Sequence, residues 1–105
     1  MKFSLLLKGH LALALTALAM GAYANANIDN GKAIDRNSCY GCHAKKSGFG
    51  NGDMIYLRSD SKVSSLVKLK TMVERCNTEL RLDLFPEDEA DVTAYLNQQF
   101  YKFKP

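Results

Sequence analysis

The chain has 105 residues, of which 47% are hydrophobic and 24% charged, and its formal net charge at pH 7 is +3. This length fits one domain and is too short for two ordinary ones. Without residues 1–24, which include Lys2 and Lys8, 12 basic and 11 acidic residues leave a formal charge of +1. A charge so close to zero argues against a nucleic-acid partner.

Residues 1–24 have the pattern of a secretory signal peptide. Lysines precede an apolar run, residues 11–19, and Ala22-Tyr23-Ala24 is a small-x-small cleavage sequence; a second one, Ala24-Asn25-Ala26, lies two residues later. The apolar run is shorter than the ~20 residues that span a bilayer. We therefore expect an exported protein that has no membrane span after cleavage, with one mature domain over residues 25–105.

The first predicted helix covers residues 29–38, has Asn27 or Asp29 as its N-cap, and leads into Cys39-Tyr40-Gly41-Cys42-His43. A Cys-x-x-Cys-His run is the attachment sequence for c-type haem. Each thiol can form a thioether with one haem vinyl group, and His43 can then give an imidazole nitrogen to the iron. We therefore expect one haem c per chain, bound covalently through Cys39 and Cys42, with His43 as the proximal iron ligand. In bacteria this attachment is completed outside the inner membrane, which predicts a periplasmic protein.

A glycine-rich loop, residues 44–60, is expected after the motif. The next predicted helix covers residues 61–76, with Ser61 or Asp60 as its cap and Asn77 as its stop. Its apolar positions repeat every three or four residues and form one stripe: Leu66, Leu69, Val73 and Cys76.

The last predicted helix begins at Pro86, a residue that suits the first helical position. Three acidic residues follow in the first turn, where the helix dipole favours negative charge. Residues 80–85, before this helix, alternate like a strand but have no second strand to pair with, so we expect an irregular wall against the haem. The expected buried face of the last helix consists of Val92, Tyr95, Leu96, Phe100 and Phe103.

The order helix, haem motif, loop, helix and terminal helix resembles the class I cytochromes c. Gly31, eight residues before the first cysteine, stands where that family has a small residue that lets the terminal helix cross closely, and Tyr95 and Leu96 match the pair that meets it. The resemblance implies an all-α, small cytochrome c fold with about three helices wrapped around one covalent haem. The family usually has an aromatic residue four positions before the first cysteine, where this chain has Asp35; either Ile34 takes its place or the first helix sits differently.

The sixth iron position decides between two kinds of haem protein. A methionine there gives a low-spin electron carrier, whereas an empty position binds small gases. Because His10 belongs to the signal, His43 is the only histidine of the expected mature chain, which excludes two histidine ligands from it. The candidates are Met72, in the second helix, and Met54, in the glycine-rich loop; the remaining alternative is no protein ligand. Neither methionine matches the family's usual place on a loop shortly before the terminal helix.

A second resemblance supports the gas-binding alternative. The segment from Cys76 to Leu96 is similar to the C-terminal half of the sphaeroides haem proteins, small monohaem cytochromes c with a labile asparagine ligand that bind oxygen or nitric oxide. Two positions differ. The ligand asparagine is replaced by Arg75, which stays protonated and cannot bind iron, and the cysteine that pairs with the first one is replaced by Leu84.

The third cysteine, Cys76, has no partner once the haem has taken the other two. It can be a buried small hydrophobe, a link between two chains or a redox sensor. Lys45 and Lys46, just after the motif, can dock an acidic redox partner near the haem edge or simply form a solvated face. Three more lysines can extend that surface: Lys62, Lys68 and Lys70.

These patterns favour a periplasmic one-electron carrier that is not an enzyme and whose partners are redox proteins such as other cytochromes c. The alternative within the same class is a haem protein with an open or labile distal site that binds small gaseous ligands. From another class, Cys39 and Cys42 could form a dithiol oxidoreductase pair, but such a site should lie between a strand and a helix, and His43 would have no role. Structural zinc would need a fourth ligand that the sequence does not offer.

Overall fold

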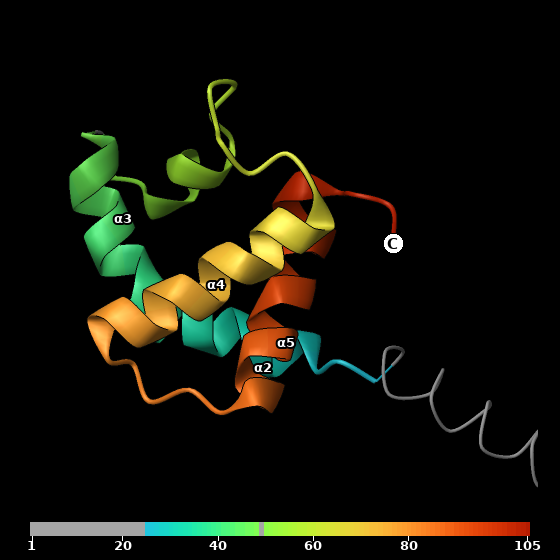
Figure 1. The fold of residues 1–105 in the computed structure, drawn as a ribbon. Coiled ribbons are helices and arrows are strands. Elements are labelled where there is room, and N and C mark those ends of the chain that lie inside the picture. Colours follow the sequence, from blue (N-terminus) through green and yellow to red (C-terminus); the bar gives the residue numbers. More distant parts are fainter. Residues whose placement is uncertain (1–24, 49) are drawn as a thin grey trace, which may run out of the picture.

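The computed structural model describes residues 25–48 and 50–105 (Figure 1). The expected signal peptide, residues 1–24, lies outside the described residues. Within the described ranges every regular element is helical and no strand occurs, which confirms the all-α prediction. In the same ranges no helix is both long and apolar enough to cross a membrane.

The first helical stretch is longer than predicted and runs through the haem motif. It consists of α2 (Ile28–Ile34), a π-helical turn (Asp35–Cys39) and α3 (Tyr40–Ser47). Asn27 is the cap, with its side chain accepting a hydrogen bond of 3.0 Å from the backbone nitrogen of Asn30. The stretch therefore ends nine residues after the predicted Ser38, so the motif lies within the helical stretch rather than between a helix and a loop.

The second predicted helix is placed too early. α4 spans Leu66–Leu80, and its cap is Ser65, whose side chain accepts from the backbone nitrogen of Lys68 at 3.2 Å. The predicted caps Ser61 and Asp60 precede the helix, which starts where the apolar stripe starts. The predicted loop before it contains a short 3-10 helix, Gly52–Tyr56.

Asn77 is not a helix stop, because α4 continues past it to Leu80. Its amide group donates to the Leu84 carbonyl at 3.0 Å, and its carbonyl accepts from the Leu84 nitrogen at 3.0 Å. The same amide donates to Glu89 Oε2 at 3.1 Å. Asn77 thus ties the irregular segment after α4 to the helix, and that segment lacks strand structure as expected.

The last helix, α5 (Pro86–Leu96), begins at Pro86 as predicted and continues into a π-helical turn (Asn97–Tyr101). Asp88 closes the first turn, accepting from the Phe85 nitrogen at 3.1 Å. Of the five residues expected on its buried face, three are buried, Phe100 packs against them partly exposed, and Phe103 lies beyond the helical turns, stacked on Tyr101.

Helices α2 and α5 cross in close contact (Figure 1). A Cβ atom at Gly31 would overlap the Asp91 carbonyl oxygen and lie 2.8 Å from the Cβ of Tyr95. Asn30 fastens the crossing by donating from Nδ2 to Asp91 at 2.9 Å and to Asp88 at 3.0 Å. The predicted close crossing at Gly31, with Tyr95 against it, is confirmed.

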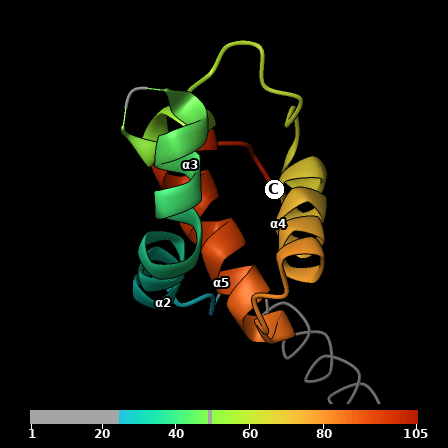
Figure 2. The same cartoon turned by 90° about the vertical axis from the view of Figure 1, so that its left-hand side faces the viewer.

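Helix α5 is the centre of the molecule. Figure 2 shows α4 on one side of it and α2 and α3 on the other. The buried hydrophobic side chains of the described part come from α4, α5 and the 3-10 helix: Tyr56, Leu69, Val92, Tyr95 and Leu96. Because α4 packs mainly on α5, space is left between α4 and α3.

Candidate haem site

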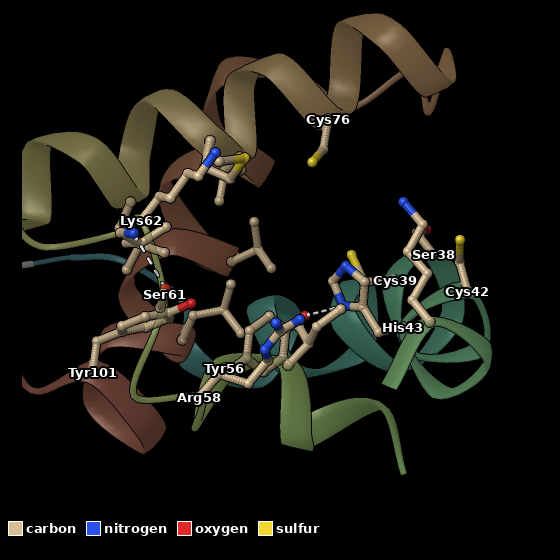
Figure 3. Close-up of a pocket in the computed structure, with 18 of the residues that line it drawn as sticks. Ser38, Cys39, Cys42, His43, Tyr56, Arg58, Ser61, Lys62, Cys76 and Tyr101 are labelled. Atoms are coloured by element: carbon tan, nitrogen blue, oxygen red, sulfur yellow. Dashed lines mark hydrogen bonds between the residues drawn. The ribbon is translucent and has the colours of Figure 1, made fainter. Parts of the chain in front are cut away.

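A cavity of about 480 Å³ lies between α3 and α4. Its volume falls within the range of cofactor and small-molecule sites. Cys39, Cys42 and His43 line it from one side, and α4 lines it from the other (Figure 3). Apolar side chains form much of the rest of its wall: Leu69, Val73, Val92 and Leu96.

The two motif cysteines face this cavity from neighbouring turns of the helical stretch, since residues three apart share a helix face. Neither forms a disulfide; Cys39 is half-buried and Cys42 is exposed. Burial, with smaller contributions from Asp35 and Cys76, raises the pKa of Cys39 to about 12. A dithiol oxidoreductase needs a thiolate with a lowered pKa, so this environment argues against that alternative.

His43 is held by a chain of two hydrogen bonds. Its Nδ1 lies 2.9 Å from the hydroxyl of Tyr56, and that hydroxyl donates to Oδ1 of Asp35 at 2.5 Å (Figure 3 shows the first contact). Since the Tyr56 proton is directed to Asp35, the Tyr56 oxygen accepts from Nδ1–H of His43. This tautomer leaves the Nε2 lone pair of His43 available to a metal.

Burial shifts the pKa of every member of this chain. It lowers the pKa of His43 below its usual 6.5, with Asp35 acting in the opposite direction. The imidazole is therefore neutral at pH 7, the form that binds iron. Burial also raises the pKa of Asp35, an effect that the hydrogen bond from Tyr56 partly offsets, and burial together with that bond raises the pKa of Tyr56.

Tyr56 reaches His43 because the 3-10 helix is pressed against α3. A Cβ at Gly52 would lie 2.6 Å from the Tyr40 carbonyl oxygen, so only glycine permits this approach. Arg36 pairs with Asp53 at 3.1 Å and its guanidinium lies 4.7 Å from the centre of the Tyr40 ring. These contacts fix the 3-10 helix beneath the haem motif.

The wall opposite His43 is made by α4. Met72 and Cys76, one turn apart, both line the cavity there, and Cys76 points across toward His43 in Figure 3. Met54 is 39% exposed and lines a neighbouring surface hollow, which shares Lys46 and Arg58 with the cavity. Asn77 is the asparagine nearest the ligand position of the sphaeroides haem proteins. Its side chain is already hydrogen-bonded to Leu84 and Glu89.

The end of the cavity away from the cysteines is polar. Ser61, Lys62 and Tyr101 line this end (Figure 3), and Arg58 and Asp60 line the cavity as well. Arg58 is paired with Asp60 at 2.9 Å and also lines a hollow beside Lys46 of α3, whereas Lys62 is exposed. The cationic side chain of Lys62 at this end suits the carboxylates that a haem carries on the edge opposite its vinyl groups.

The residues of the cavity fit a covalent haem. Two thiols stand beside a neutral imidazole with a free Nε2, much of the wall is apolar, and Lys62 lies at the far end. In residues 25–48 and 50–105, no three His, Cys, Asp or Glu side chains converge as a bare metal ion would require. A haem supplies four nitrogen ligands to its own iron, so the protein has to provide only the axial ligands.

Comparison with protein-family models, curated proteins and solved structures finds no match.

Tyr56 and the role of Asp35 are the parts of the site that the sequence analysis missed. Asp35 stood out only as a departure from the class I cytochrome pattern, yet its side chain is 0% exposed. An acidic residue four positions before the first motif cysteine on one helix lies on the same face as that cysteine, which was a signal that its carboxylate lies beside the motif. Tyr56 gave no comparable signal, because it lies thirteen residues after His43 in a segment that looked like a loop.

Proposed function

We propose that the protein is a periplasmic monohaem c-type cytochrome that carries single electrons. Cys39 and Cys42 bind the haem covalently, and His43 is the proximal iron ligand. The observation that carries the proposal is the convergence of these three residues on one apolar cavity with Nε2 of His43 free.

The haem, when bound, supplies an iron centre that cycles between two oxidation states. The chain's residues would orient and shield it: the two thiols would anchor it covalently, and Lys62, at the far end of the cavity, suits its carboxylates. The apolar walls would keep water away from it, and low water access helps set the potential of a haem. Cys42 is exposed, so a group attached to it would be near the surface, where an electron could pass to a partner.

Met72 is the best candidate for the distal ligand, since it lines the cavity on the wall opposite His43 and Met54 does not. A thioether ligand favours an electron carrier with a fairly high potential. The redox partner would be an acidic protein such as another cytochrome c, because Lys45 and Lys46 are exposed on α3 next to the motif.

An optical experiment tests this function. The exported protein is purified, oxidised and reduced, and its spectra are recorded with and without carbon monoxide. A covalent haem spectrum, a sulfur-to-iron charge-transfer band when oxidised and no change with carbon monoxide when reduced support the electron carrier. A haem that binds carbon monoxide readily would instead favour a small-ligand-binding protein, and a colourless protein would rule out both.

A further inference from the structure

The hydrogen-bond chain from His43 to Asp35 is more than packing. Asp35 is completely buried, one of its carboxylate oxygens accepts from Tyr56, and the other, Oδ2, has no hydrogen-bond partner in the described part of the chain. Burying a carboxylate in this way is costly, so a purely structural role for it would be poorly compensated. An apolar or aromatic side chain would fill the same place more favourably.

The geometry joins this carboxylate to the iron ligand through one hydroxyl. Tyr56 is itself buried, and its ring packs edge-on against His43 with centroids 5.2 Å apart and on Phe100 at 5.0 Å. The hydroxyl therefore has little freedom to turn away from its two partners. The 3-10 helix that carries Tyr56 is fixed by Gly52 and by the Arg36–Asp53 pair.

A histidine that donates its second N–H to a strong acceptor binds a metal more tightly through its other nitrogen. We propose that Asp35, acting through Tyr56, makes His43 a stronger electron donor to the haem iron and so lowers the reduction potential of the protein. Both residues are positioning residues: neither touches the iron. The inference rests on the proposed function, because it needs a haem whose proximal ligand is His43.

The test compares Tyr56→Phe with Tyr101→Phe in the full exported chain. Both tyrosines line the cavity, but it is the Tyr56 hydroxyl that lies at hydrogen-bond distance from His43, whereas Tyr101 packs its ring against Tyr56 and Phe103. Phenylalanine keeps each ring and removes only the hydroxyl. Haem content is measured first by the pyridine haemochrome spectrum, and the midpoint potential is then measured by optical titration.

The expected result for Tyr56→Phe is a potential raised by about 59 mV, a tenfold change in the one-electron equilibrium constant, with haem content unchanged. Tyr101→Phe should shift the potential much less. Asp35→Asn keeps the shape and an acceptor for Tyr56 but removes the charge, so it should raise the potential in the same direction. Asp35→Asn should shift the potential less in the Tyr56→Phe background than in the original protein, because Tyr56→Phe already breaks the hydrogen-bond link to His43.

The iron–histidine stretching vibration of the reduced haem gives a second measurement, taken with Met72→Ala in the background to remove the candidate distal methionine. It should fall in frequency when Tyr56 becomes Phe. Equal shifts of the potential in the Tyr56 and Tyr101 variants, or an unchanged iron–histidine vibration, would overturn the inference while leaving the haem intact. Absence of haem from the unsubstituted protein would overturn the proposed function instead.

Discussion

At the scale of single residues, the two methionines that the sequence offers as candidate distal ligands have different surroundings in the structure. Met72 lies on the face of α4 that lines the cavity, whereas Met54 lies in the 3-10 helix and lines a hollow on the surface. A ligand must point at the iron, and the iron must lie where Nε2 of His43 can reach it. The two positions can therefore be separated by substitution.

Met72→Ala should remove the sulfur-to-iron charge-transfer band of the oxidised protein and make the reduced protein bind carbon monoxide, because the distal position loses its donor. Met54→Ala is the matched control and should leave both properties unchanged. Absorption spectra of the two variants with and without carbon monoxide are the measurement. Loss of the band in Met54→Ala alone would assign the ligand to Met54 in the 3-10 helix.

Substitution should also show which of the three cysteines attach the haem covalently. Cys39→Ala and Cys42→Ala together should abolish haem that survives denaturation, because only thioether bonds persist when axial ligation is lost. Either single substitution should leave one thioether and a weakened attachment. Cys76→Ala is the control and should keep full covalent haem, measured by the intact mass of the chain and by haem staining of a denaturing gel. Loss of covalent haem in Cys76→Ala would contradict this assignment.

The sequence indicates one half of this site and not the other. The spacing of Cys39, Cys42 and His43 is local chemistry on one helix, so the motif predicts the cavity wall that they line. The opposite wall depends on how α4 packs on α5, and the distance from Met72 to His43 depends on that packing. The bond from Tyr56 to Asp35 likewise requires the 3-10 helix to fold back against α3, which no local pattern shows.

At the scale of elements, the fold follows the sequence where one strong local signal acts and departs from it where several compete. Pro86 and the acids after it give α5 an unambiguous start. Before α4, residues 59–65 include several Ser and Asp residues that can act as caps, and the one adjacent to the apolar stripe, Ser65, is used. Asn77 is a residue type that often ends helices. Here its side chain instead hydrogen-bonds Leu84 and Glu89, which follow α4 in the chain, and these bonds stabilise Asn77 within the helix.

The crossing of α2 and α5 gives a prediction about stability. Gly31→Ala should destabilise the protein by about 1–3 kcal/mol or more, because the new methyl group meets backbone atoms of Asp91 that cannot move without separating the helices. The measurement is the free energy of unfolding by urea, followed by far-ultraviolet circular dichroism.

Gly41→Ala is the control for that substitution. Gly41 lies in helix α3, is exposed and has nothing within 4 Å of an added Cβ. Alanine in a helix interior is favoured over glycine by roughly 0.5–1 kcal/mol, so this variant should be as stable as the original or slightly more so. Equal losses of stability at both positions would show that the close contact between α2 and α5 at Gly31 is not the cause of the loss.

At the scale of the whole molecule, the described chain has a small core around a large cavity. Its buried hydrophobic side chains cluster along α5, while several large apolar residues are exposed: Met54, Leu57, Val67, Leu80 and Phe85. A dry cavity costs about 24 cal/mol per Å³ when side chains are removed from a core. For 480 Å³ that is roughly 12 kcal/mol, which is comparable to the total stability of a small domain; it is an upper bound because exposed Cys42, Arg58 and Lys62 line the cavity and admit water.

Haem should therefore be required for a cooperative fold. The exported protein should unfold in one sharp thermal transition, whereas the same chain exported with Cys39→Ala and Cys42→Ala, once stripped of any loosely held haem, should keep helical far-ultraviolet signal but lose near-ultraviolet signal and sharp unfolding. Differential scanning calorimetry and circular dichroism of the two proteins measure this difference. The Cys76→Ala variant, prepared identically, controls for the loss of a thiol and should unfold like the original. A haem-free double variant that unfolds as sharply as the haem-bound protein would show that α4 packs on α5 strongly enough to hold the cavity open without a cofactor.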